Sequence, residues 1–159
     1  MDVCDGLIPP PLAEAGADPV KQLRELFNRA AFWAKDRSEA DLSTALAFSS
    51  PVISVWNGPQ LIGFARATSD GVFRATIWDV VVHPEYRGLG VGRKLLEALL
   101  DHPQMRRVER VYLMTTYQQA FYERMGFAEN STTTMVRCAA GAEPAAADLV
   151  QDLVSQLQI

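Results

Sequence analysis

The feature that most constrains the fold is the stretch from Val80 to Leu100, which reads VVVHPEYRGLGVGRKLLEALL. An apolar strand leads through a proline turn into a glycine-rich loop, and an amphipathic helix follows directly. Glycines let the main chain approach a ligand closely, and the first turn of a helix has free N–H groups at the positive end of its dipole. The junction at residues 87–92 therefore predicts a site for an anion such as a diphosphate.

Length and composition limit the classes of protein to which this chain can belong. With 159 residues, 48% of them hydrophobic, it can bury one full core and is expected to form a single domain. No apolar run approaches the ~20 residues that cross a bilayer, and the first residues lack the pattern of a secretory signal. Cys4 and Cys138 give neither a metal-ligand spacing nor a disulfide framework, so we expect a reducing compartment.

The net charge of −4 gives no support to nucleic-acid binding. It is also unevenly distributed, because residues 138–159 contain Glu143, Asp148 and Asp152 but no lysine or arginine. The rest of the chain is close to neutral, which is compatible with a locally basic site for an anion.

Hydrophobic periodicity and turn residues predict the order of the elements. Residues 1–17 are expected to be irregular or extended, residues 18–138 to form the domain, and residues 139–159 to form a linker and an acidic amphipathic helix. Asp18 and Ser38 are candidate N-caps for the first two helices. Within the domain we expect helices over 19–31, 39–48, 91–100 and 117–125, and strands over 52–56, 61–68, 72–83, 108–115 and 128–138.

This order predicts an α+β fold with a central mixed, mostly antiparallel sheet that is flanked by helices. An antiparallel meander before the glycine loop is unlike a dinucleotide-binding fold, in which strands and helices alternate from the start. A P-loop is excluded because no Gly-Lys-Ser/Thr ends the motif. The alternative interpretation of the loop is a turn whose glycines only allow a helix to pack closely.

Two motifs carry a resemblance to a known family. The first fits the pattern V-x-P-x-x-(R/Q)-x-x-G-x-(G/A), with Val82, Pro84, Arg87, Gly90 and Gly92 at its defined positions. The second, FYERMGF at residues 121–127, is similar to (L/F)YE-x-x-GF. In this order and about thirty residues apart, they resemble the signatures of the GNAT superfamily of N-acetyltransferases. The resemblance covers roughly residues 20–137 and implies the GNAT acyltransferase fold.

Residues 61–70, 75–80 and 110–116 also resemble the plastid and cyanobacterial branch that is similar to serotonin N-acetyltransferase. This resemblance implies transfer of acetyl from acetyl-CoA to a primary amine, without choosing among an arylalkylamine such as serotonin, a protein lysine and a protein N-terminus. It also implies the chloroplast stroma, or the cytoplasm in a cyanobacterium. We expect a monomer or homodimer with no metal, no nucleic-acid partner and no membrane partner.

The resemblance assigns acetyl-CoA to the loop and to the strand before it. The diphosphate is expected at Arg87 and at the backbone N–H groups of Gly88, Leu89, Gly90, Val91, Gly92 and Arg93. The pantetheine arm would pair like another strand with Val80, Val81 and Val82, where their strand separates from the next. A main-chain N–H near Val80 would polarise the thioester carbonyl. Many relatives contact this arm through an asparagine at the position of Thr115.

Two side chains are candidates for proton transfer. The acceptor must attack as a neutral amine, although a lysine-like amine has a pKa of about 10.4 in water, so a base or a desolvated site is needed. Asp79 is the carboxylate beside the thioester, and in an ideal strand it shares a face with Ile77 and Val81. Tyr122 matches the family's general acid, which protonates the departing CoA thiolate. The alternatives are a buried structural carboxylate and a tyrosine that only packs its helix.

Other interpretations stay open. A non-catalytic module that binds acetyl-CoA would need neither candidate, and an interaction protein could use the acidic C-terminal helix. Five aromatic residues could line a slot for the acceptor or belong to the core: Trp56, Phe64, Phe73, Trp78 and Tyr117. His83 is expected on the surface at the end of its strand, and His102 at the end of a helix.

Overall fold

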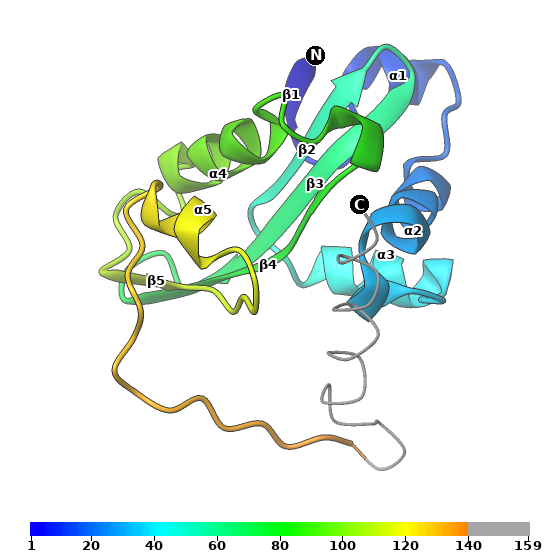
Figure 1. The fold of residues 1–159 in the computed structure, drawn as a ribbon. Coiled ribbons are helices and arrows are strands. Elements are labelled where there is room, and N and C mark those ends of the chain that lie inside the picture. The colour runs from blue at the N-terminus through cyan, green and yellow to red at the C-terminus, as the bar shows by residue number, and fades with distance from the viewer. Residues whose placement is uncertain (140–159) are drawn as a thin grey trace. The chain divides into compact units, whose positions relative to one another are not determined.

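The strands of the protein form one mixed sheet. In the computed structural model, which describes residues 1–139, they are β1 (Asp2–Asp5), β2 (Val52–Asn57), β3 (Gln60–Ser69), β4 (Arg74–Val82) and β5 (Arg110–Tyr112). Their spatial order is β1-β2-β3-β4-β5 (Figure 1). Strands β1 to β4 are antiparallel to their neighbours, whereas β5 runs parallel to β4. This confirms the predicted α+β class and the mixed, mostly antiparallel sheet.

The chain divides into two compact units, Met1–Tyr117 and Gln118–Ile159. The first unit contains the sheet and six helical segments, which are α1 (Pro10–Glu14), α2 (Pro19–Ala30), η1 (Phe32–Ala34), α3 (Glu39–Ala47), η2 (Pro84–Tyr86) and α4 (Val91–Asp101). Two of the helices begin at the predicted caps. The side chains of Asp18 and Ser38 accept hydrogen bonds of 3.0 and 3.1 Å from the N–H groups of Lys21 and Asp41.

Helices cover both faces of the sheet, with α4 on one face and α2 and α3 on the other (Figure 1). Helix α4 buries a stripe of apolar side chains at helical spacing, which are Val91, Leu95, Leu96 and Leu99. On the opposite face, Phe27 of α2 meets Phe64 of β3 edge to face, with 5.6 Å between ring centroids. Because helices occupy both faces, the edges and ends of the sheet are the parts most open to a large ligand.

The N-terminal segment, expected to be irregular or extended, contains an extended strand and also a short helix that was not predicted. Strand β1 pairs with β2 from Asp2, opposite Trp56, to Asp5, opposite Ile53, and α1 follows. A strand of four residues is too short to show an alternating pattern. It forms because β2 offers an open edge of backbone N–H and C=O groups, and that information lies fifty residues away.

Strands β4 and β5 pair over a short distance only. Their contacts run from Arg74, opposite Arg110, to Thr76, opposite Tyr112. Within the described residues, the remainder of β4, from Ile77 to Val82, has no strand partner on this edge. The two strands therefore separate where the resemblance implied a gap.

The second unit contains α5 (Gln119–Glu123), and its described part ends at residue 139. Gly126 has φ of +87°, and the N–H of Phe127 donates to the carbonyl of Tyr122 at 3.1 Å, so the predicted C-cap is confirmed. The strands expected over 128–138 are absent. Met135 and Val136 are exposed, so they bury no apolar surface that would stabilise a strand. The predicted acidic C-terminal helix lies outside the described residues.

Candidate active site

The glycine-rich loop presents a row of backbone N–H groups. Gly88 and Gly90 have φ of +75° and +80°, a region that side-chain-bearing residues rarely adopt. In the described structure no N–H from Gly88 to Arg93 donates to a protein acceptor, and the first bond of α4 runs from Lys94 N–H to Gly90 O at 3.0 Å. These amides lie at the N-terminus of a helix of eleven residues, so they can bind an anion by donating hydrogen bonds to it.

Gly88 and Gly90 do not serve close packing. A Cβ added to Gly88 or Gly90 would meet no atom within 4 Å. This does not fit the alternative in which the glycines only allow the helix to approach its strand. The loop is also held from outside, because Arg87 Nη2 donates to the carbonyl of Ala30, at the end of α2, at 3.3 Å.

Strand β4 carries a β-bulge at its centre. Asp79 and Val80 together stand opposite the single Ala65 of β3, so β4 has one extra residue at this point. Asp79 has φ of +52°, in the left-handed region. The amide that the resemblance assigns to the thioester carbonyl, that of Val80, therefore belongs to a bulge on the edge that β5 leaves open.

The bulge changes the predicted grouping of side chains in part. Asp79 was expected to share a face with Ile77 and Val81. It does share a face with Val81, which packs in the core cluster beside its cross-strand partner Phe64, and Asp79 contacts Arg66 on that same face. Ile77, which lies before the bulge and pairs with Ala67, is not part of this cluster. The pattern of one strand cannot reveal this, because a bulge depends on the register with the partner.

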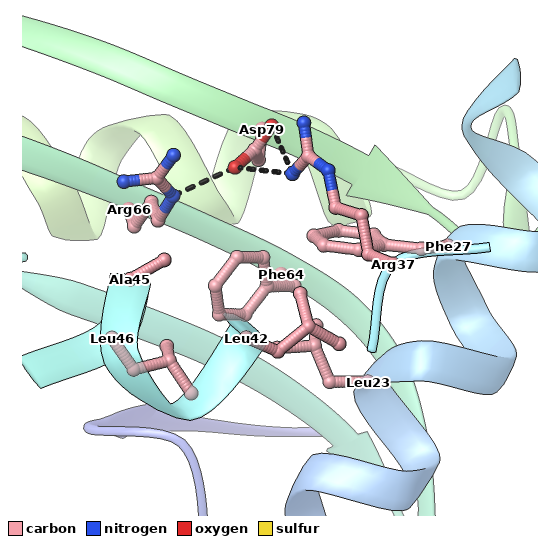
Figure 2. Close-up of a pocket in the computed structure, with 9 residues that line it drawn as sticks. All are labelled: Leu23, Phe27, Arg37, Leu42, Ala45, Leu46, Phe64, Arg66 and Asp79. Carbon is pink, nitrogen blue, oxygen red and sulfur yellow. Dashed lines mark hydrogen bonds and ion pairs between the residues drawn. The ribbon is translucent and has the colours of Figure 1, made fainter. Parts of the chain in front are cut away.

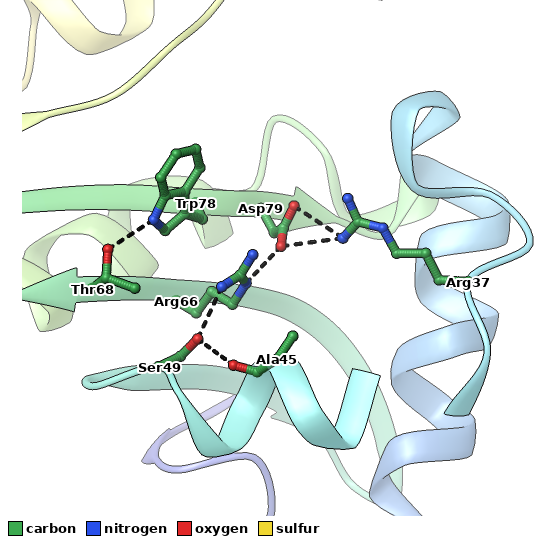
Figure 3. Close-up of polar contacts among 7 residues, drawn as sticks. All are labelled: Arg37, Ala45, Ser49, Arg66, Thr68, Trp78 and Asp79. Carbon is green, nitrogen blue, oxygen red and sulfur yellow. Dashed lines mark hydrogen bonds and ion pairs between the residues drawn. The ribbon is translucent and has the colours of Figure 1, made fainter. Parts of the chain in front are cut away.

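Asp79 is paired with two arginines. Its Oδ2 accepts from Arg66 Nε at 2.7 Å, and Arg37 Nη1 donates to Oδ1 and Oδ2 at 3.4 and 3.3 Å (Figure 3). The Asp79 side chain is only 8% exposed. With one carboxylate and two guanidinium groups, the cluster has a net charge of +1, and both carboxylate oxygens are occupied.

This cluster forms one wall of a small pocket between α2, α3 and the sheet (Figure 2). The other walls are apolar, formed by Leu23, Phe27, Leu42, Ala45, Leu46 and Phe64. Arg37 lies over the ring of Phe27, with 5.5 Å from its guanidinium carbon to the ring centroid. The site therefore combines a charged rim with an apolar interior.

The family follows from the sequence over this same region. Residues 20–127 match the acetyltransferase (GNAT) family. The chain belongs to the GNAT family. The co-substrate of this family is acetyl-CoA, whose diphosphate fits the unpaired amides of the loop.

Relatives place this GNAT chain in the branch that its sequence indicates. It is 40% identical over 103 residues to an uncharacterized N-acetyltransferase, ycf52, of Porphyra purpurea, covering 60% of this chain and 57% of the relative. It is 37% identical over 117 residues to serotonin N-acetyltransferase 2, chloroplastic, of Oryza sativa subsp. japonica, covering 69% of this chain and 56% of the relative. The chain thus spans just over half the length of these relatives.

The fold of a solved structure agrees. A crystal structure of a putative GNAT-family acetyltransferase from Xanthomonas campestris has a TM-score of 0.70 and 27% sequence identity, covering 89% of this chain and 96% of the other. The GNAT fold predicted from the two motifs is therefore confirmed.

Tyr122, the predicted acid of the GNAT chain, lies in the second unit. Its ring packs edge to face against Phe121 and Phe127, at centroid distances of 5.1 and 6.0 Å. Burial raises the pKa of the Tyr122 phenol above its ordinary value. Thr115 follows β5 and belongs to no strand. The predicted roles of both residues stay predictions.

The five candidate aromatic residues of the acceptor slot do not share one environment. Trp56 and Phe64 are fully buried in the core, whereas Phe73 is 61% exposed. Trp78 is half-buried and donates from Nε1 to Thr68 Oγ1 at 3.0 Å. An aromatic slot built from all five is therefore wrong, since two of them are interior residues.

His83 was expected on the surface but is buried. Its Nδ1 accepts from the N–H of Glu85 at 3.4 Å, and its Nε2 has no partner among the described residues. His102 ends α4, as predicted. In the described part of the chain, no three metal-ligating side chains gather at one point, and no helix is long and apolar enough to cross a membrane.

Arg37 and Arg66 were missed by the sequence analysis. Arg66 could have been found from the sequence, because it is a charged residue in the otherwise apolar stretch LIGFARA and needs a partner of opposite charge if it is buried. Its cross-strand neighbourhood includes Asp79, the carboxylate of the next strand. No sequence pattern identifies Arg37, since it lies in a connection between helices.

Proposed function

We propose that this GNAT chain is an acetyl-CoA-dependent N-acetyltransferase that transfers the acetyl group to a primary amine by direct attack in a ternary complex. The observation that carries the proposal is the row of unpaired amides from Gly88 to Arg93, next to the open, bulged edge of β4. An anion-binding loop beside an open strand edge suits a long ligand with a diphosphate at one end.

The chain's backbone would hold the two ends of acetyl-CoA. The amides of residues 88–93, helped by Arg87, bind the diphosphate. The edge of β4 at Val80, Val81 and Val82 pairs with the amides of the pantetheine arm. The Val80 N–H donates to the thioester carbonyl and stabilises the negative charge that develops on its oxygen during attack.

The attacking amine must lose its proton, and Asp79 is the carboxylate that lies at the bulge. Both of its oxygens already accept hydrogen bonds from arginine. This favours a role in positioning the amine, with a water molecule carrying the proton away, over direct abstraction by the carboxylate. The net positive charge of the cluster also disfavours an ammonium ion nearby, which promotes the neutral amine.

Tyr122 would donate the proton that the departing thiolate requires. Burial raises its pKa, so the phenol is fully protonated at neutral pH. A free thiol has a pKa of about 8.5, so a phenol of higher pKa transfers its proton efficiently only when it is held in position. Thr115 would contact the arm of CoA.

The acceptor is an arylalkylamine, a lysine side chain or a protein N-terminus. The name of the rice relative, a serotonin N-acetyltransferase, supports the first of these. The same name, which includes the chloroplast, supports a location in the chloroplast stroma. The chain would act as a monomer or a homodimer.

Release of free thiol tests the proposal. The protein is incubated with acetyl-CoA and, in turn, serotonin, tryptamine, a lysine peptide and a peptide with a free N-terminus. Thiol release with at least one acceptor is expected, and none is expected from a folded Gly90→Glu variant, whose carboxylate enters the anion site. Binding of acetyl-CoA without thiol release on any acceptor would contradict catalysis and favour a binding module.

A further inference from the structure

The bulge in β4 contains a residue in an unfavourable conformation. Asp79 adopts φ of +52° without being glycine, and it does so in the interior of a strand. Such a conformation persists only where the surroundings hold it. The side chains that contact Asp79 are therefore the candidates for what maintains the bulge.

Arg66 is placed to hold Asp79 from the adjacent strand. It lies on β3 directly after the single residue that faces the bulge, and its Nε reaches Asp79 Oδ2 at 2.7 Å. Arg66 is itself fixed, because its Nη1 donates to Ser49 Oγ at 2.9 Å and Ser49 Oγ donates to the carbonyl of Ala45 in α3 at 2.7 Å (Figure 3). The bulge is thus connected through two side chains to a helix.

Arg37 holds the same carboxylate from the opposite side. Its Nη1 lies 3.4 and 3.3 Å from the two oxygens of Asp79, and its guanidinium group rests on the ring of Phe27 in α2. Figure 3 shows the carboxylate between the two guanidinium groups. With α3 on one side and α2 on the other, the carboxylate has little freedom to turn.

We propose that Arg66 and Arg37 are positioning residues that act through Asp79 to maintain the bulge, and with it the place of the Val80 N–H. This inference rests on the proposed function, in which that N–H donates to the thioester carbonyl. The arginines touch neither the carbonyl nor the amine in this account. They determine whether the amide meets the carbonyl at the correct distance, and a misplacement of about 1 Å can cost a factor of about 100 in rate.

Infrared spectroscopy of acetyl-CoA with a 13C-labelled carbonyl measures the hydrogen bond directly. In the wild-type complex without acceptor, the carbonyl band moves to lower wavenumber than in free acetyl-CoA. In Arg66→Met this displacement shrinks, kcat falls about tenfold or more, and the dissociation constant of acetyl-CoA changes less than twofold, because the loop is untouched. Arg66→Lys, which keeps the charge, restores part of the displacement, and Arg37→Met gives a smaller loss.

Arg24→Met is the matched control. Arg24 forms an ion pair with Glu39 at 3.1 Å, between α2 and α3, and both side chains are more than 40% exposed. Its removal should leave the carbonyl band at the wild-type position. A folded Arg66→Met protein with the wild-type band would overturn the inference while leaving the proposed acetyl transfer intact. A wild-type complex with no displacement would instead overturn the proposed role of Val80, and the inference with it.

A glycine at position 79 keeps the test decisive if Arg66→Met does not fold. Glycine adopts φ of +52° freely and leaves no carboxylate unpaired. The band of Asp79→Gly should therefore stay displaced, and adding Arg66→Met to it should change the band no further. A further loss of displacement in the double variant would mean that Arg66 acts by another route, against the inference.

Discussion

Gly63 of β3 lies directly under Val91, the first residue of α4. A Cβ at position 63 would come within 2.7 Å of Val91 Cγ1 and 3.2 Å of Leu95 Cδ1. Valine cannot move aside easily, because its branched side chain has few rotamers in a helix. The absence of a side chain at Gly63 therefore sets how closely the start of α4, and the amides of the loop, approach the sheet.

Gly63→Ala should consequently weaken acetyl-CoA binding as well as stability. Overpacking of this kind costs about 1–3 kcal/mol in the free energy of unfolding. Urea denaturation and calorimetric titration with acetyl-CoA measure the two effects. Gly71→Ala is the control, because Gly71 has φ of +76° in a hairpin turn with open space around it. It should lose stability without losing affinity, and equal affinity losses in both variants would contradict the account.

Tyr122→Phe should reduce turnover far more than cofactor affinity. The variant removes only the hydroxyl group and keeps the ring contacts with Phe121 and Phe127. Loss of a general acid typically lowers the rate by a factor of about 100 to 10,000. Steady-state kinetics and direct binding of acetyl-CoA separate the two quantities. An unchanged kcat would remove Tyr122 from the mechanism.

Asp79→Asn tests the buried ion pairs separately from the backbone. Asparagine tolerates the left-handed region, so the substitution removes the charge and adds little strain. It leaves Arg66 and Arg37 unpaired, which should lower the free energy of unfolding by about 2 kcal/mol, less than for a fully buried pair because Arg37 is 36% exposed. Glu39→Gln, in the exposed pair with Arg24, should cost under ~0.5 kcal/mol in the same urea denaturation. Equal losses of unfolding free energy in the two variants would show that burial of Asp79 contributes nothing to stability.

The hairpin between β3 and β4 should loosen in acid. Asp70 Oδ1 accepts from the N–H groups of Val72, Phe73 and Arg74 at 2.9, 2.7 and 3.0 Å. These backbone hydrogen bonds lower the pKa of Asp70 below its ordinary value. Because the folded pKa is the lower one, the stabilisation is present above the unfolded pKa of about 3.9 and is lost as the pH falls through the folded value. An NMR titration of the Asp70 carboxyl carbon that gave an ordinary or raised pKa would contradict these contacts.

The sequence predicted correctly those features of the structure that depend on residues close together in the chain. Each of these features is determined by residues within or next to the element that it defines. They are the caps at Asp18 and Ser38, the glycine C-cap at Gly126 and the apolar stripe of α4. The glycine-rich turn before α4 belongs to this class as well, since the turn and the helix after it are contiguous, whereas its role as an anion site stays a prediction. These features were predicted with nearly correct bounds.

Features that depend on distant pairing were not predictable in this way. Strand β1 forms because the edge of β2 has backbone groups available for pairing, and the bulge at Asp79 forms because β3 and β4 shift register. The burial of His83 and the partners of Arg37 also depend on residues from other elements. The absence of the strands expected over residues 128–138 has the same origin, because a segment forms a strand only where a sheet edge and a buried face receive it.

The central claim is that the main-chain amides of the loop hold the diphosphate of acetyl-CoA, and NMR of the 15N-labelled protein tests it most directly. On titration with acetyl-CoA, the N–H resonances of residues 88–93 should shift more than any others outside β4, and 3′-dephospho-CoA, which keeps the diphosphate, should shift them too. Loop amides that stay in place at saturating acetyl-CoA would contradict the claim.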